Sequence, residues 1–485
     1  MTHIVVLALF VVIALRDAAI GDGRVPMLAD LSPVAIALGT LLPLAGIALA
    51  VEMAMRSLGR IIDRTGMPAA AIVAGRILDV SRVLIVAAHI WAVFALGWVD
   101  LVRSVIGDLP GVDELVALAP AAITMALGWA SYHGIDRRIR EAGVLGALDR
   151  GDTVPRLVPR WVYVVEQVRH NLLFILVPVA LMITWWEVLV MATDWAAKRW
   201  DWAARAAEAS WPVTVIHLTG VLVLAALMPL VLRRLWRTVR LGPGPMRDRL
   251  VSLGEAHHVG FRDVLVWRTH TEVVNAAVIG IAPVARFVLL TDTLLERLPL
   301  IGVEAVMAHE VGHARRHHIP WLMGAMVATL TLAFDGAGRV AMLLVPPDRG
   351  AGLGDMGLAV IVAIAASIAA LGFVSRRFEL QADAFAAQHL SGFRPGHTPP
   401  AQTPPISPEA AYVMINSLDA VARLNHSNPR RFTLRHGSIR WRQSQLHNLV
   451  GVPANRLPID RTVRIIKGAI LAGVIAVVWL SLSGS

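Results

Sequence analysis

The sequence predicts a multi-pass α-helical membrane protein with one modest water-facing α+β domain. Two observations support this fold class: 56% of the 485 residues are hydrophobic and only 16% are charged, and apolar runs of spanning length recur along the chain. Soluble and disordered chains do not have this composition. The sequence also has no cysteine, so any metal must be held by histidines and carboxylates.

Nine apolar runs are candidates for membrane spans. They are residues 4–15, 33–50, 83–99, 115–132, 172–190, 213–232, 319–334, 358–374 and 465–482. The first run is short and is followed by Arg16 and Asp17, which favours a tilted or shallow helix over a cleaved signal peptide. We therefore expect eight or nine spans.

The distribution of arginine predicts the orientation of these spans. Arginines gather in residues 57–82, in residues 136–169 and directly after residue 232, whereas residues 100–114 and 194–208 have no such excess. Cytoplasmic loops carry the excess of basic residues, so nine spans with a cytoplasmic N-terminus place residues 233–318 and 375–464 on the cytoplasmic side. This bias explains the net charge of +10 without a nucleic-acid partner. Because 43 of the 45 basic residues are arginine, we expect a GC-rich, bacterial genome. We expect the spans to lie in the plasma membrane.

The chain divides into a membrane region and a domain with soluble features. We expect about six spans in residues 1–240, a domain over residues 241–464 that is interrupted by spans at 319–334 and 358–374, and a last span within residues 465–485. Helices are predicted at 246–257 and 408–426, and strands of a small mixed sheet at 264–267, 272–279 and 286–291. Residues 395–408 are rich in proline, which predicts a flexible connector.

The sequence His309-Glu310-Val-Gly-His313 holds the most informative motif, H-E-x-x-H. On a helix, residues four apart share a face, so both imidazoles can bind one metal ion. Glu310 lies beside them and can act as general base toward a water molecule. His317 and His318 follow closely, but we interpret them as interfacial residues that continue the helix into the next span, and we leave them out of the site.

A second motif, at residues 375–383, directly follows the predicted span at 358–374. It contains the candidate for a third metal ligand. Glu379 is expected to complete a zinc site with three protein ligands and one open position. Asp383 lies one helical turn later and can accept the other ring N–H of a ligand histidine. The alternative interpretation of Asp383 is a surface residue that forms a salt bridge with Arg376 or Arg377.

These residues resemble the membrane-embedded gluzincin zinc endopeptidases that include the CaaX prenyl protease and the bacterial heat-shock protease HtpX. The resemblance covers about residues 245–445 and rests on H-E-x-x-H and on S-R-x-x-E-x-x-A-D, which begins at Ser375. It implies a zincin-type domain with one Zn²⁺ per chain. The remaining motifs of the family correspond to Asn275, Ala276, His436 and Arg442.

In the family, the Asn-Ala pair lies on a strand whose edge aligns the substrate backbone, which implies this role for Asn275 and Ala276. The downstream histidine corresponds to His436, expected to stabilise the oxyanion, with Arg442 in support. Gly437 and Ser438 stand where relatives often have two prolines.

The function that these residues predict is hydrolysis of peptide bonds in membrane or misfolded proteins. The expected mechanism uses metal polarisation of a water and a carbonyl, with Glu310 moving the proton to the leaving amine. The partners are a polypeptide substrate and the lipid bilayer. Two alternatives remain open: a signalling metalloprotease that cleaves a regulator, and a non-catalytic membrane scaffold of the same fold.

Overall fold

The computed structural model describes most of the chain as two compact units, residues 1–236 and 237–485. The described residues are 2–21, 28, 31–66, 69–150, 157–208, 211–269, 274–344, 353–394, 399, 402–425 and 427–483. Within this part of the chain, eight helices are long and apolar enough to cross a membrane, five in the first unit and three in the second. The predicted fold class, a multi-pass helical membrane protein of eight to nine spans, is confirmed.

The described part of the first unit is built from helices. They are α1 (Thr2–Gly21), α2 (Pro33–Thr65), α3 (Ala69–Ile90), α4 (Trp98–Ile106), α5 (Val112–Arg150), α6 (Arg160–Gln167), α7 (Phe174–Ala197), α8 (Asp201–Glu208) and α9 (Trp211–Leu235). Helix α1 includes the shallow helix predicted at residues 4–15, and it is not among the eight candidate spans. Its Val6, Leu9 and Ile13 are buried in the core that α1 shares with α3, α5 and α7.

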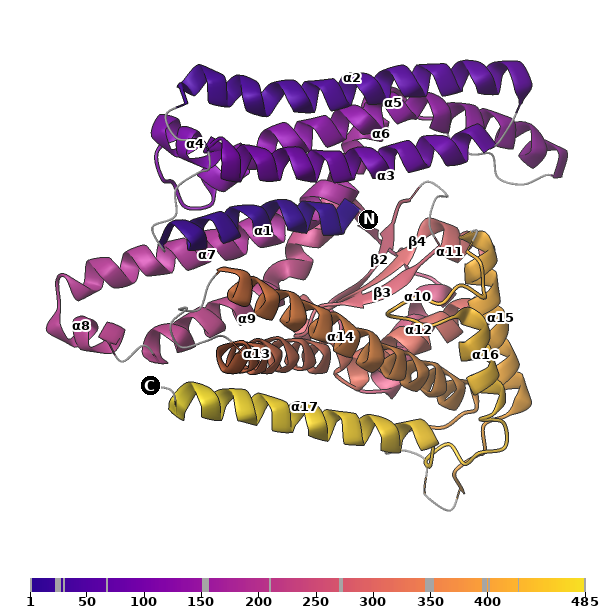
Figure 1. Ribbon diagram of the computed structural model, residues 1–485. Helices are drawn as coiled ribbons and strands as arrows, with labels where there is room; N and C mark the ends of the chain where they lie inside the picture. The colour runs from indigo at the N-terminus through magenta and orange to yellow at the C-terminus, as the bar shows by residue number, and fades with distance from the viewer. Residues whose placement is uncertain are drawn as a thin grey trace. The chain divides into compact units, whose positions relative to one another are not determined.

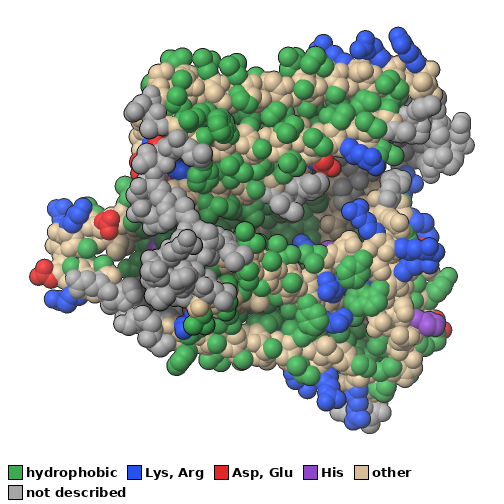
Figure 2. Space-filling model, viewed as in Figure 1, with side chains coloured by type: hydrophobic (Ala, Val, Ile, Leu, Met, Phe, Trp, Pro, Cys, Tyr) green, Lys and Arg blue, Asp and Glu red, His purple; other side chains and the backbone are tan. Residues whose placement is uncertain are grey.

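The surface of the long helices has the pattern of lipid-facing elements. On α2, Val34, Leu42 and Leu49 are each at least 60% exposed, which is unfavourable in water and normal in a bilayer. Figure 2 shows such hydrophobic side chains over the long helices, with lysine and arginine gathered near the ends.

The second unit combines a small mixed sheet with helices. Its strands are β1 (Thr238–Arg240), β2 (Asp263–Trp267), β3 (Ala276–Ile279) and β4 (Phe287–Thr291), in the order β1-β2-β4-β3. Strands β2 and β4 pair in parallel, and the other two pairs are antiparallel. Because β3 is last in this order, it is an edge strand that pairs with β4, with Ala276 opposite Leu290 and Ile279 opposite Phe287. Three helices lie near the sheet in Figure 1, namely α10 (Pro245–Ala256), α11 (Asp292–Arg297) and α12 (Leu300–Arg315).

The described part of this unit has five further helices. They are α13 (His318–Leu344), α14 (Leu353–Leu390), α15 (Pro408–Leu424), α16 (Ile439–His447) and α17 (Pro458–Ser483). Helices α13, α14 and α17 are the three candidate spans and pack against one another, as Figure 1 shows. Helix α14 is much longer than the run predicted at 358–374, because its apolar first part leads without a break into the polar motif around Glu379.

Several element boundaries differ from the sequence predictions. Strand β3 begins at Ala276, and residues 272–273 of the predicted strand lie outside the described residues. Strand β1 was not predicted, because a three-residue strand has no readable alternation. Part of the predicted connector 395–408 lies outside the described residues. Its described end is held in place, because the Ile406 amide donates to the carbonyl of Val452.

Candidate metal centre

Helix α12 carries the H-E-x-x-H motif and lies between the sheet and α14. It begins directly after Pro299, and Val303, Met307 and Val311 are fully buried in the core shared with β2, β4 and α14. Gly312 permits the close approach of α14, since a Cβ there would lie 3.1 Å from the ring of Phe385. This packing fixes the rotation of α12, so that His309 and His313 share the face that turns toward the polar part of α14.

Helix α14 places its two acids on the opposing face. Glu379 and Asp383 are four residues apart, so they lie one turn from each other, and both side chains are buried. His309 Nδ1 lies 2.8 Å from Asp383 Oδ1. Because a carboxylate only accepts hydrogen bonds, this contact places the His309 proton on Nδ1 and leaves Nε2 free to bind a metal. Asp383 therefore occupies the position predicted for it.

Three donor groups converge on one point and fit a divalent cation. One ligand atom each from His309, His313 and Glu379 lie within 4.8 Å of one another. The two Nε2 atoms are 3.2 Å apart, and the shortest contacts to Glu379 are 3.5 Å from His313 and 3.7 Å from His309. Tetrahedral bonds of about 2.0–2.1 Å require ligand separations of about 3.3 Å, so these distances fit Zn²⁺ with little adjustment.

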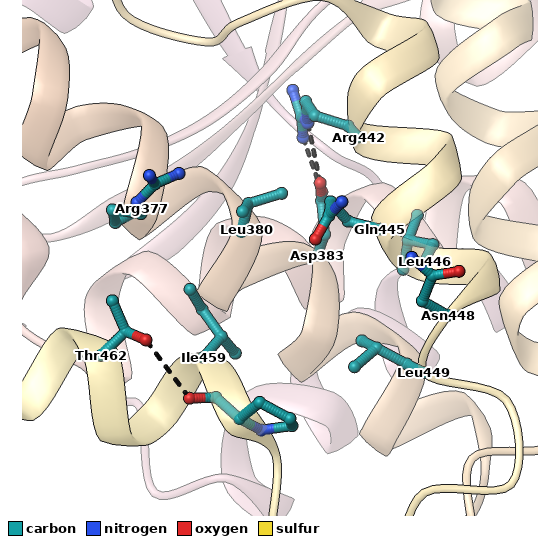
Figure 3. Close-up of a pocket in the computed structure, with 11 residues that line it drawn as sticks. Arg377, Leu380, Asp383, Arg442, Gln445, Leu446, Asn448, Leu449, Ile459 and Thr462 are labelled. Carbon is teal, nitrogen blue, oxygen red and sulfur yellow. Dashed lines mark hydrogen bonds and ion pairs between the residues drawn. The ribbon is translucent and has the colours of Figure 1, made fainter.

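Arg442, on α16, neutralises the acids of the site. Its Nε and Nη2 donate to the two oxygens of Asp383 at 2.7 and 2.6 Å, and Nη1 lies 3.0 Å from Glu379 Oε2. Figure 3 shows the guanidinium facing the Asp383 carboxylate, beside a cavity of about 330 Å³. Burial opposes the charge of Arg442, but the two carboxylates outweigh it and raise its pKa. We predicted that Arg442 supports His436; its guanidinium is instead directed at the acids, because charged groups this deeply buried must be paired.

His436 reaches the site from a tight turn. Thr433 and Gly437 exchange two backbone hydrogen bonds, and the carbonyl of Leu434 accepts a bond from Arg376 at 2.9 Å. Gly437 has a φ of 71°, a left-handed conformation that glycine adopts readily. The turn places His436 Nδ1 3.0 Å from Glu379 Oε1, so the imidazole lies at the edge of the donor triangle.

Glu310 and the edge of β3 line the same cavity, whose volume is about 430 Å³. The Val278 amide of β3 donates to Glu310 Oε2 at 3.4 Å, so this N–H points away from β4. Asn275 and Ala276 also line the cavity, although the Asn275 side chain accepts from the Ala276 amide at 3.0 Å. The structure thus brings a carboxylate and an open strand edge to the donor triangle.

Burial and nearby charges set the protonation of the α12 residues. Burial raises the pKa of Glu310 to about 7, with a further contribution from the negative charge of Glu379. Burial and the neighbouring His309 lower the pKa of His313 to about 3, which keeps it neutral. For His309 burial acts in the same direction, but the bond to Asp383 outweighs it and raises the pKa.

The structure adds one residue that the sequence analysis rejected. We predicted that His318 continues the helix as an interfacial residue. Instead α12 ends at Arg315, His317 takes a positive φ of 54°, and α13 begins at His318. This break turns His318 inward, where it is 1% exposed and its Nδ1 lies 2.8 Å from His313 Nδ1.

A helix pair with this donor set, in a chain with helices that can span a bilayer, is typical of a membrane metalloprotease. Residues 248–394 match the model of peptidase family M48, which confirms the resemblance predicted from the two motifs. The solved structure of S. mikatae Ste24p is similar at a TM-score of 0.34 and 12% identity, over 84% of this chain and 98% of that one. Comparison with curated protein sequences gave no match.

Proposed function

We propose that the chain is a zinc-dependent endopeptidase that hydrolyses peptide bonds of membrane or misfolded proteins. The observation that carries this proposal is the donor triangle of His309, His313 and Glu379, with Glu310 beside it in one cavity. Two imidazoles and a carboxylate form a donor set that suits Zn²⁺. A zinc ion bound there would supply a Lewis acid that acidifies water and polarises a peptide carbonyl.

Glu310 is the proposed general base and acid. Without a bound metal, burial raises its pKa to about 7, a value that suits proton transfer near neutral pH. It would accept a proton from the attacking water as the new C–O bond forms, and it would deliver that proton to the amide nitrogen as the C–N bond breaks. His436, at the edge of the triangle, is proposed to donate to the oxyanion that develops between these two steps.

The proposed substrate is an extended segment of polypeptide that pairs with β3. The Val278 N–H faces the cavity rather than β4, and backbone groups two residues apart point to the same side of a strand. A substrate strand added at this edge would be recognised mainly through its backbone, which permits broad side-chain specificity. We also propose that residues 233–318 and 375–464 face the cytoplasm, as the arginine distribution predicts.

The test is cleavage of casein by detergent-purified protein, with bound zinc measured in the same samples. The variant is Glu310→Gln, and Glu255→Gln is the matched control, because this exposed glutamate lies on α10. We expect near-stoichiometric zinc in all three proteins and loss of cleavage only in Glu310→Gln. Wild-type protein that binds no zinc would refute the metal centre, and zinc-bound wild type that cleaves neither casein nor membrane-protein substrates would favour the scaffold alternative.

A further inference from the structure

We propose that His318 is a positioning residue that acts with Gln381 and Asp460 to fix the tautomer of His313, so that His313 presents Nε2 to the metal. The inference rests on the proposed metal centre and assigns it a support that the H-E-x-x-H pattern does not contain. It joins four residues on four different elements, namely α12, α13, α14 and α17.

The four side chains form a continuous series of contacts. His313 Nδ1 lies 2.8 Å from His318 Nδ1, and His318 Nε2 lies 2.9 Å from Gln381 Oε1. The Gln381 amide then donates through Nε2 to Asp460 Oδ1. His318 and Gln381 are buried, and the His318 ring stacks on Phe378 with centroids 4.2 Å apart and planes 10° from parallel. The ring therefore has a single fixed orientation.

The series has only one consistent assignment of donors and acceptors. The Asp460 carboxylate only accepts, so Gln381 must direct its NH₂ group to Asp460 and its oxygen to His318. That oxygen only accepts, so His318 carries its proton on Nε2 and, as a neutral ring, accepts at Nδ1. His313 must then donate from Nδ1. Its Nε2 is left without a proton and faces His309 Nε2 and Glu379, where the metal would bind.

The two histidine ligands are thus oriented by different means. His309 is held by the Asp383 carboxylate, a contact predicted from the sequence. The Nδ1 atom of His313 instead contacts His318, and the relay through His318 and Gln381 links it to Asp460 in the first turn of α17. Outer partners of this kind typically change metal affinity by about 10- to 100-fold.

The experiment compares zinc affinity in two substitutions that separate hydrogen bonding from packing. His318→Phe keeps an aromatic ring against Phe378 but removes both nitrogens. His318→Asn loses the stacking but retains an amide oxygen that can accept from His313. His317→Asn is the control, because His317 is exposed and asparagine tolerates its positive φ. Zinc affinity is measured on full-length protein in detergent by competition with a chelator, and thermal unfolding is recorded in parallel.

We expect His318→Phe to bind zinc about 10- to 100-fold more weakly than wild type, His318→Asn to lose less, and the control to be unchanged. A packing role predicts the opposite order, with the phenylalanine variant closer to wild type. That order, or equal affinity in all variants, overturns the relay while leaving the proposed protease intact. Wild-type protein without zinc overturns the metal centre itself and the relay with it.

Discussion

Replacement of Glu310 by glutamine is expected to stabilise the metal-free protein at pH 8 and to have much less effect at pH 5. Burial raises the pKa of this carboxyl from its ordinary value of 4.5 to about 7 in the folded state. A group with a raised pKa contributes its full stability below the unfolded value and loses it as the pH rises through the folded value. Here the loss occurs between about pH 4.5 and pH 7.

The magnitude follows from the two pKa values. The difference between 4.5 and about 7 corresponds to about 3 kcal/mol of unfolding free energy, since one pKa unit equals about 1.4 kcal/mol. Glutamine has no charge to bury, so it removes this cost. Near the melting temperature, 1 kcal/mol displaces Tm by about 2–4 °C in a domain of roughly 200 residues, so the Tm of Glu310→Gln should exceed that of wild type by several degrees at pH 8.

The assay is thermal unfolding of chelator-treated protein in detergent at pH 5 and pH 8. Glu255→Gln serves again as control, because it changes the net charge equally at an exposed position. Any effect of the lost contact with the Val278 amide is present at both pH values and cancels in the comparison. The reasoning is refuted if the difference in Tm between Glu310→Gln and wild type is the same at both pH values, or is larger at pH 5.

Three further predictions concern the same site. Arg442→Met removes the guanidinium that pairs with the buried carboxylates of Asp383 and Glu379. Thermal unfolding of the metal-free protein should therefore show a loss of about 3–5 kcal/mol, with a smaller loss in Arg442→Lys. In Gly437→Ala, the alanine must adopt a positive φ, and its Cβ would lie 2.6 Å from the ring of Trp441. The turn should therefore shift, with a loss of about 1–2 kcal/mol of unfolding free energy and a lower kcat/KM on casein. Chelation should abolish cleavage reversibly, with activity regained in proportion to added zinc.

Each of these three predictions would be contradicted by a specific outcome. An Arg442→Met protein as stable as wild type would mean that the acids are protonated or paired elsewhere. Unchanged kcat/KM in Gly437→Ala would show that the position of the turn carrying Gly437 does not affect turnover. Cleavage that survives complete removal of metal would exclude a metallopeptidase.

The sequence alone was sufficient where function depends on local spacing. His309 and His313 are four residues apart on one helix, and the same spacing separates Glu379 and Asp383, so each pair shares a face wherever the helix lies in the fold. Composition alone indicated the membrane spans, because a long apolar run has few other stable environments. The resemblance to the membrane-embedded gluzincin endopeptidases followed from these local motifs.

Only the tertiary structure decided how the helices and loops complete the site. Arg442 is separated from Asp383 by 59 residues, and its pairing with the acids depends on the packing of α16 against α14. The sequence predicted that His318 belongs to a continuous helix. In the structure, the positive φ of His317 breaks the helix, and the His318 side chain contacts His313. Asp460 reaches the relay only because α17 packs beside α13 and α14. Such contacts join distant parts of the chain, and their pairing is set by the rotation and depth of packed helices, which no local pattern encodes.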